Sequence, residues 1–228
     1  SGGIDSSVVS TLCASTGRKT IVLTMPIKQI KSQHDLSLKH AKWLKDKFKN
    51  VEHHLIEMDK IFGSFSKVLN NFDNEHGFAN SRARLRMATL YQVAAANSGI
   101  VVGTGNKVED FGVGFYTKYG DGGVDISPIA DLLKSEVFKI AHHLGIVSSI
   151  QKAKPTDGLW DDDRSDEDQL GATYDELEWA MNYLEVNYQG NLSERQKKVL
   201  QIYSGHHQTN LHKMNPIPVC EIPKSLRS

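Results

Sequence analysis

The first seven residues of the chain, Ser-Gly-Gly-Ile-Asp-Ser-Ser, have the composition of a phosphate-binding loop. Gly2 and Gly3 lack a β-carbon, so the backbone can approach a ligand closely there. Apolar residues at helical spacing follow up to Ser15, and the amino end of a helix attracts anions. Asp5 would repel a phosphate unless a Mg²⁺ ion lies between them. The segment therefore predicts a phosphate and Mg²⁺ site, with a flexible Gly/Ser chain end as the alternative.

A second glycine-rich segment, Phe-Tyr-Thr-Lys-Tyr-Gly-Asp-Gly-Gly-Val-Asp, covers residues 115–125. It carries Lys118, Asp121 and Asp125 in the same part of the chain as the apolar run 99–104. Charged groups beside a buried strand are costly unless a ligand or hydrogen bonds satisfy them. This favours a ligand site, and a surface hairpin made of the same residues is the alternative.

Short β-branched runs alternate along the chain with longer segments of helical periodicity. We predict strands over 20–25, 51–58 and 99–104, and helices over 5–15, 36–48, 80–97, 134–144, 176–186 and 194–203. This alternation indicates βαβ units, and therefore an α/β fold in which a parallel, twisted sheet carries helices on both faces. Two segments show no periodicity: 152–169, and the tail from residue 205 onward.

Length and composition point to one domain that acts on small molecules. The chain of 228 residues suffices for one core, and its 27 basic and 27 acidic residues give zero formal charge, which argues against a nucleic-acid partner. It has no apolar run long enough for a membrane helix. Cys13 and Cys220 form no CxxC pair, so we expect a cytoplasmic protein. A strand normally leads into a phosphate-binding loop, so we expect that a strand ahead of Ser1, and the segment before it, are missing.

The pattern SGGxDS at residues 1–6 resembles the ATP-binding loop of the N-type ATP pyrophosphatases, which cleave ATP to AMP and pyrophosphate. Further motifs select one family within that superfamily: 81–87 (SRARLRM), 104–109 (TGNKVE), 115–125, 127–132 (SPIADL), 154–160 (KPTDGLW), 166–168 with Gly171, and the pair His212-Lys213. In this order, over essentially the whole chain, they resemble the ammonia-dependent NAD synthetases. The resemblance implies a Rossmann-like sandwich of the adenine nucleotide alpha hydrolase type. It also implies ATP-dependent amidation of deamido-NAD to NAD through an acyl-adenylate, with AMP and pyrophosphate released.

The resemblance also implies roles for individual residues. It places ATP at Ser1, Gly2, Gly3, Ile4, Asp5, Ser6, Thr104, Lys134 and Thr156, and deamido-NAD at Arg84, Lys118, Asp125, His212 and Lys213. It gives Mg²⁺ the carboxylates of Asp5 and Glu109. Two catalytic roles follow: Lys134 neutralises charge on the phosphates, and Asp121 lies near the incoming ammonia.

One spacing departs from the family pattern. Between Glu109 and Lys118 the chain is one residue longer than the commonest spacing, which leaves Asp110 as an adjacent carboxylate for the metal ion.

The sequence encodes no glutaminase with a nucleophilic cysteine, so we expect ammonia to be the direct nitrogen donor unless a glutaminase precedes this chain. Two other functions share the loop: a tRNA-modifying or GMP-forming enzyme, and a nucleotide-binding module without catalysis. The presence of Asp5, Glu109 and Lys134 together favours the ligase.

Two further expectations concern assembly and motion. The helix over 80–97 is apolar on more than one face, which favours a homodimer whose interface contributes to the deamido-NAD site. A central helix buried by its own domain is the alternative. The aperiodic segment 152–169, which includes Trp160, is our candidate for a mobile lid over the site.

Overall fold

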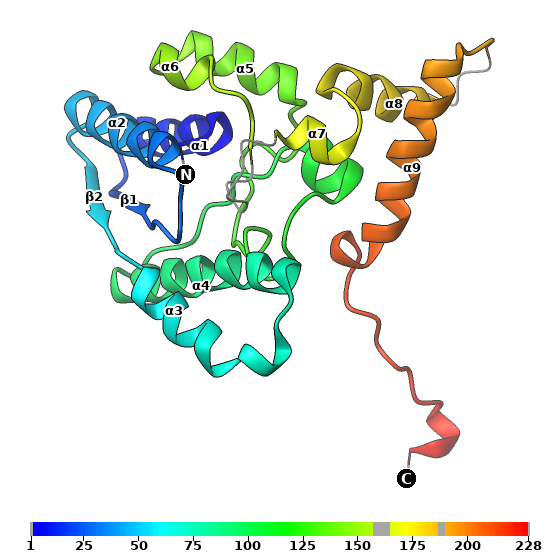
Figure 1. The fold of residues 1–228 in the computed structure, drawn as a ribbon, viewed down its shortest axis with the longest axis horizontal. Coiled ribbons are helices and arrows are strands. Elements are labelled where there is room, and N and C mark those ends of the chain that lie inside the picture. The colour runs from blue at the N-terminus through cyan, green and yellow to red at the C-terminus, as the bar shows by residue number, and fades with distance from the viewer. Residues whose placement is uncertain (1, 157–164, 187–189, 228) are drawn as a thin grey trace.

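The computed structural model describes residues 2–156, 165–186 and 190–227 of the chain (Figure 1). Its elements, in chain order, are α1 (Ile4–Ser15), β1 (Thr20–Thr24), α2 (Lys31–Lys47), β2 (Val51–Leu55), α3 (Asp59–Val68), η1 (Asn70–Phe72), α4 (Glu75–Ala96), η2 (Lys107–Val113), α5 (Lys134–His143), α6 (Ser148–Gln151), α7 (Asp166–Leu170), α8 (Tyr174–Val186), α9 (Glu194–Met214) and η3 (Lys224–Leu226). The element η2 is a π-helix, whereas η1 and η3 are 3₁₀ turns.

The strands β1 and β2 form a parallel pair, in register from Thr20 opposite Val51 to Thr24 opposite Leu55. Parallel neighbours need a crossover connection, and α2 supplies it. In Figure 1, α1 and α2 lie on one side of this pair and α3 and α4 on the other. The prediction of an α/β fold with a parallel sheet between helices is confirmed.

The strand predicted over 99–104 is largely absent. Only Val102 forms a bridge, parallel to Ile126. Gly103 N donates to Ile126 O at 2.8 Å and Asp125 N donates to Val101 O at 2.9 Å. The pairing stops there because the chain turns into η2, whose first residues follow Asn106. The prediction of a full strand was wrong, since apolar character alone does not provide a partner strand.

Most of the predicted helices are present, and their ends differ. The helix α4 begins before the predicted Asn80 because Asn74 caps it, accepting a hydrogen bond from Gly77 N at 2.7 Å. The helix α9 continues to Met214, so the prediction of an aperiodic tail from residue 205 was wrong over that range. In the predicted lid, residues 166–170 form α7, and residues 157–164, with Trp160, lie outside the described part of the chain.

Two apolar clusters fix the helices that surround the site. The first joins α1, α5 and α6, and includes Ile4, Val8, Ile129, Val137 and Ile150. The second joins η2, α7, α8 and α9, and includes Val108, Val113, Leu170, Leu177 and Val199. The ion pairs of Lys134 lie between them and connect α1, η2 and α5.

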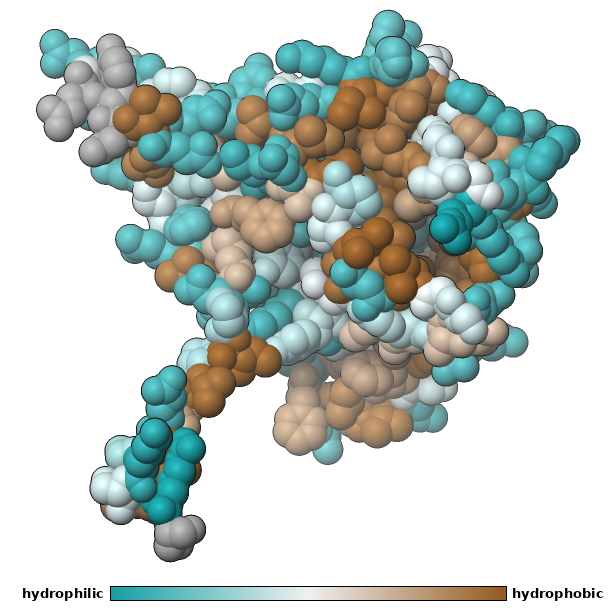
Figure 2. Space-filling view, turned by 180° about the vertical axis from the view of Figure 1, so that it is seen from behind, coloured by the Kyte–Doolittle hydropathy of each residue, from teal (hydrophilic) through white to brown (hydrophobic). Residues whose placement is uncertain are grey.

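Residues 215–227 leave the end of α9 and run away from the body of the molecule as an arm (Figures 1 and 2). Apolar side chains on the arm are exposed, with Ile217 at 65 % and Val219 at 81 %. The arm therefore adds nothing to either apolar cluster.

We expect Leu177→Ala to lower the free energy of unfolding by about 2 to 5 kcal/mol, because the fully buried side chain would leave a cavity between α8 and α9. Leu184→Ala is the matched control on the same helix, since Leu184 is 47 % exposed. Urea unfolding of both variants measures the difference. Equal losses would show that this cluster does not hold α8.

Candidate active site

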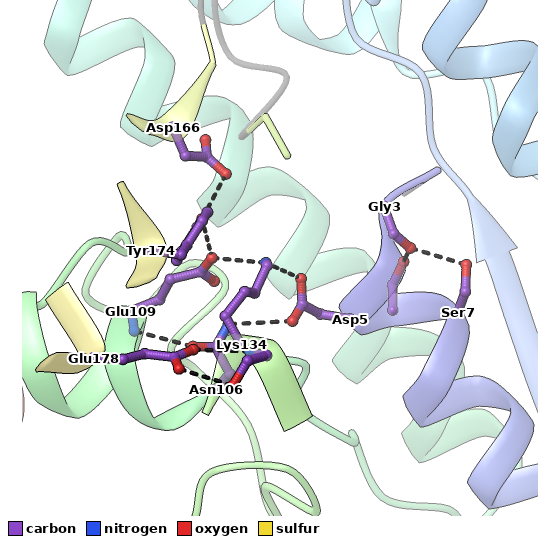
Figure 3. Close-up of polar contacts among 11 residues, drawn as sticks. Gly3, Asp5, Ser7, Asn106, Glu109, Lys134, Asp166, Tyr174 and Glu178 are labelled. Carbon is purple, nitrogen blue, oxygen red and sulfur yellow. Dashed lines mark hydrogen bonds and ion pairs between the residues drawn. The ribbon is translucent and has the colours of Figure 1, made fainter. Parts of the chain in front are cut away.

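A buried lysine joins two carboxylates (Figure 3). Lys134 Nζ lies 2.6 Å from Asp5 Oδ2 and 2.8 Å from Glu109 Oε1. The lysine side chain is 2 % exposed, whereas those of Asp5 and Glu109 are 17 % and 15 % exposed. The predicted proximity of Asp5 and Glu109 is therefore confirmed, because both carboxylates contact one nitrogen atom.

The position of Lys134 follows from the start of α5. Lys134 is the first residue of this helix, and Ser135 follows it with both its backbone N and its Oγ donating to Glu178 at 2.8 Å. Glu178, a buried residue of α8, thereby satisfies a free N–H group in the first turn of α5. An ammonium is unfavourable at the positive end of a helix, so the two carboxylates must offset that cost.

The charge of Lys134 is maintained by its neighbours. Burial alone would lower the pKa of Lys134, but the carboxylates of Glu109 and Asp5 outweigh it and raise that pKa above the usual lysine value. Its ammonium also lies 4.9 Å from the centre of the Tyr174 ring. The lysine is therefore a fixed positive charge next to the site.

Asn106 connects the two acidic residues from the other side. Its Nδ2 donates to Asp5 Oδ1 at 3.1 Å, and its Oδ1 accepts from Glu109 N at 3.1 Å. Sequence reasoning placed Asn106 in a motif but gave it no role. The sequence Asn106-Lys-Val-Glu109 is close to a capping-box pattern, and this pattern could have predicted that Asn106 caps the helix that begins after it.

Tyr174, at the start of α8, is a second residue that the sequence did not indicate. Its hydroxyl contacts Glu109 Oε1 and lies 3.1 Å from Asp166 Oδ2. Both Tyr174 and Asp166 are buried. A tyrosine on the apolar face of a helix is normally core material, so only the fold shows that its polar end reaches Glu109.

The carboxylates face a small pocket of about 110 Å³. Its lining combines residues that the sequence predicted, namely Gly3, Asp5, Ser6, Thr104, Glu109, Asp121 and Thr156, with Gly105, Asp110 and Phe115. The amino end of α1 opens into it, because Gly3, Asp5 and Ser6 all line the pocket and the N-cap residue, Gly3, has no side chain to cover the helix end. Free backbone N–H groups at this end suit a phosphate.

Two glycines allow the close approaches at this pocket. A β-carbon on Gly2 would lie 2.6 Å from Gln33 O, so the loop could not pack against α2. A β-carbon on Gly105 would lie 1.8 Å from Asp110 Oδ2. Burial raises the pKa of Asp110 well above its usual value, and the carboxylates of Asp121, Glu109 and Asp5 raise it further. This favours the uncharged form of Asp110 among its acidic neighbours.

The other residues predicted at ATP occupy supporting positions. Gly2 is buried behind the loop, and Ile4 belongs to the first apolar cluster. Ser1 lies outside the described residues.

Asp121, which was predicted near the incoming ammonia, lines the pocket. Its carboxylate accepts a hydrogen bond from Thr117 N at 2.9 Å, which holds it at the pocket wall.

Four of the five residues predicted at deamido-NAD form one connected group. Arg84 Nε donates to Lys118 O at 3.2 Å, and Lys118 Nζ donates to His212 O. Lys213 Nζ donates to Gly114 O and to Tyr116 O, both at 2.8 Å. Arg84 is exposed and Lys118 is half-buried. Their roles toward deamido-NAD stay predictions.

The fifth, Asp125, has a different set of partners. Its Oδ2 accepts from Val101 N at 2.7 Å, and its Oδ1 accepts from the Tyr91 hydroxyl at 3.1 Å. These bonds fix the short pairing near Val102. The structure gives Asp125 a local structural role, and no described contact links it to Lys118.

The family model described as NAD synthase matches residues 1–216. The chain belongs to the NAD synthase family. A curated NAD synthase relative, the NH3-dependent NAD+ synthetase of Mesoplasma florum, is 40 % identical over 182 residues, which cover 78 % of this chain and 72 % of that protein. The enzyme of the same name from Archaeoglobus fulgidus is 34 % identical over 97 % of this chain and 86 % of its own.

A solved structure shares the NAD synthase fold. The NMN synthetase of Francisella tularensis superimposes with a TM-score of 0.86 at 31 % identity, over 97 % of this chain and 87 % of that chain. The predicted family and fold class are both confirmed.

We expect Tyr174→Phe to lower the free energy of unfolding by about 1.5 to 3 kcal/mol, because it removes a buried hydrogen bond to the charged Glu109. Tyr203→Phe is the control, since Tyr203 is 5 % exposed in the same cluster and its hydroxyl is bonded to no described residue. Urea unfolding reports both values. A loss as large for Tyr203→Phe would mean that the Tyr174–Glu109 bond adds no stability.

Proposed function

We propose that this protein is an ammonia-dependent NAD synthetase that converts deamido-NAD to NAD with ATP, releasing AMP and pyrophosphate. The observation that carries the proposal is the buried lysine between two carboxylates, at the open amino end of α1. Membership of the NAD synthase family supports it, as do the names of the curated relatives.

The reaction needs an activated carboxylate, because expelling oxide from a carboxylate is prohibitive. The nicotinate carboxylate attacks the α-phosphorus of ATP, and pyrophosphate leaves. Ammonia then attacks the carbonyl of the acyl-adenylate, AMP leaves, and the ammonium proton is lost to a base. The residues at the pocket bind and orient these groups and do no covalent chemistry themselves.

Each group of the predicted site residues has a task in this scheme. The free N–H groups of α1 and Ser6 hold phosphate oxygens, and Thr104 and Thr156 complete the ATP site. Lys134 keeps the local charge favourable to the leaving pyrophosphate. Asp121 lies at the wall, where a carboxylate can orient the incoming ammonia. Arg84, Lys118, His212 and Lys213 are assigned to deamido-NAD.

Mg²⁺ fits the acidic residues of this site. Asp5 and Glu109 already share one cation, the ammonium of Lys134, and both are partly exposed to the pocket. Glu109 Oε2 accepts no hydrogen bond from the described residues, so one carboxylate oxygen can turn to the ion. Mg²⁺ prefers oxygen ligands, and in enzymes it is usually bound by one or two carboxylates together with the phosphates of the substrate. When bound, the ion neutralises charge on the phosphates.

Free ammonia is the proposed nitrogen donor. Neither cysteine is placed for glutamine hydrolysis at the pocket, since Cys13 packs against the first apolar cluster and Cys220 is exposed on the arm. The curated relatives are named NH3-dependent NAD+ synthetases.

The proposed location is the cytoplasm, because both cysteines are free thiols, as is usual in a reducing compartment. Among the described residues, no helix combines the length and apolar character needed to cross a membrane.

The direct test supplies ATP, Mg²⁺, deamido-NAD and ammonium, and measures NAD and AMP. We expect equal amounts of both products, and a loss of at least about 100-fold in kcat/KM for Lys134→Met, because Asp5 and Glu109 would then repel the phosphates. Lys139→Met, an exposed site on the same helix, is the control. Circular dichroism checks that both variants fold. Formation of ADP in place of AMP would contradict the proposal.

A second candidate substrate is nicotinate mononucleotide. The superposition on the Francisella NMN synthetase favours it, since that enzyme is named for a mononucleotide product. Both substrates present the same pyridine carboxylate, so the chemistry is unchanged. Running the assay with each substrate alone gives two kcat/KM values, and the larger one identifies the preferred nucleotide.

We also propose a homodimer that uses the second half of α4. The buried residues of this helix, Ala79, Arg82 and Ala83, all lie in its first half. Apolar residues beyond them, among them the exposed Ala88 and Ala95, are left for a partner. Arg84 follows directly after the last buried residue of α4, at the edge of this surface. There it could bind a deamido-NAD molecule that contacts both chains of the dimer.

Light scattering should give twice the mass of one chain at micromolar concentration. Ala88→Arg should shift the protein toward the monomer, because a buried charge at the interface is costly. Asp46→Arg, on the exposed face of α2, is the control. A wild-type monomer that makes NAD would contradict the shared site.

A further inference from the structure

The side chain of Asn106 is a neutral group that contacts both Asp5 in α1 and Glu109 in η2. It is fully buried, at 0 % exposure. Its amide nitrogen reaches Asp5 in α1, and its amide oxygen reaches the backbone N–H of Glu109 in η2, each at 3.1 Å. In Figure 3 it lies below the Lys134 ammonium and reaches the other carboxylate oxygen of Asp5.

The two contacts require an amide. The N–H group of Glu109 must meet an acceptor, and the carboxylate of Asp5 must meet a donor. A carboxamide offers both from one planar group, whereas a hydroxyl is shorter and a carboxylate would repel Asp5. The surrounding atoms therefore fix which end of the Asn106 amide is oxygen and which is nitrogen.

Asp5 is consequently held at both of its oxygens. Lys134 binds Oδ2 and Asn106 binds Oδ1. A divalent cation that takes up Asp5 and Glu109 competes with the ammonium of Lys134, since both cations would bind the same anionic oxygens. The hydrogen bond from Asn106 carries no charge and does not compete in this way. It can keep the carboxylate oriented while the ion is bound.

The same residue determines where Glu109 lies. Asn106 is the N-cap of η2, and the π-helix ends at Gly114, which is in the left-handed region with φ 66°. Phe115 N donates to Glu109 O at 2.8 Å, so the backbone of Glu109 is held from both directions. In the π-helix η2, each backbone hydrogen bond spans one residue more than it would in an α-helix.

We propose that Asn106 is a positioning residue for the divalent cation of this enzyme, setting the geometry of Asp5 relative to Glu109. The proposal rests on the proposed function, since it assigns that function's cation to these two carboxylates. The competing explanation is that Asn106 serves only as a helix cap and stabilises η2.

Two substitutions separate these explanations. Asn106→Ser retains a good cap for Glu109 N but cannot reach Asp5, and Asn106→Ala removes both contacts. Asn74 provides a matched control, because it is an asparagine cap of α4 that accepts a hydrogen bond from Gly77 N and contacts no carboxylate in the described part of the chain. The variants Asn74→Ser and Asn74→Ala therefore measure a cap alone.

The measurement is Mn²⁺ binding in the presence of an ATP analogue with a methylene group between the α- and β-phosphates. The electron paramagnetic resonance signal of free Mn²⁺ reports it without turnover. We expect the dissociation constant to rise by about 10 to 100-fold in both Asn106 variants and to stay unchanged in both Asn74 variants. The thermal midpoint should fall in the two alanine variants and be largely recovered in the two serine variants.

The outcomes are distinct. Wild-type Mn²⁺ affinity in Asn106→Ser would overturn the proposal and leave Asn106 as a cap. Failure of the wild-type protein to bind Mn²⁺ with the analogue would overturn the cation site itself, and the role of Asn106 with it. If the wild type binds Mn²⁺ but makes no amidated product, the proposed function fails while the positioning role is still judged by the Asn106 variants.

Discussion

The structure depends on one buried cation, the ammonium of Lys134, held between the carboxylates of Asp5 and Glu109. Three charges removed from water are stable only if each is paired and hydrogen-bonded. Asn106 and Tyr174 provide the remaining hydrogen bonds. Replacing such a triad with apolar residues is often neutral or stabilising, so its presence indicates a demand of function more than of stability.

The rest of the fold brings the three charged residues together and keeps them there. One apolar cluster fixes α1 against α5, and the other fixes η2 against α8 and α9. From α9, His207 contacts Gly112 O at 2.6 Å and Asn210 donates to Val113 O at 2.9 Å. Lys213 continues this row at Gly114 O. Side chains of α9 thus satisfy successive carbonyl groups where η2 ends. These bonds hold η2, and with it Glu109, in contact with Lys134.

The sequence by itself determined the kind of fold, most of the helices and the three charged residues that meet beside the pocket. Helical periodicity identified the segments that became α1, α2, α4, α5 and α8 because it is a local property of side-chain spacing. Motif order identified Asp5, Glu109 and Lys134 together, although they lie far apart in the chain. The family resemblance assigned Asp5 and Glu109 to one Mg²⁺ ion, and this assignment predicted that the two carboxylates lie close together.

Only the tertiary structure decided which groups complete the site. Whether the run 99–104 forms a strand depends on a partner strand, and Val102 alone has one at Ile126. The roles of Tyr174 and Glu178 come from one helix, α8, which packs against both η2 and α5, and no local pattern in the sequence predicts that packing. Lys213 has a motif position in sequence, and its observed contacts are with the carbonyl groups of Gly114 and Tyr116. The sequence gives the chemical type of each side chain, but the partner of a buried polar atom depends on how segments distant in sequence pack together.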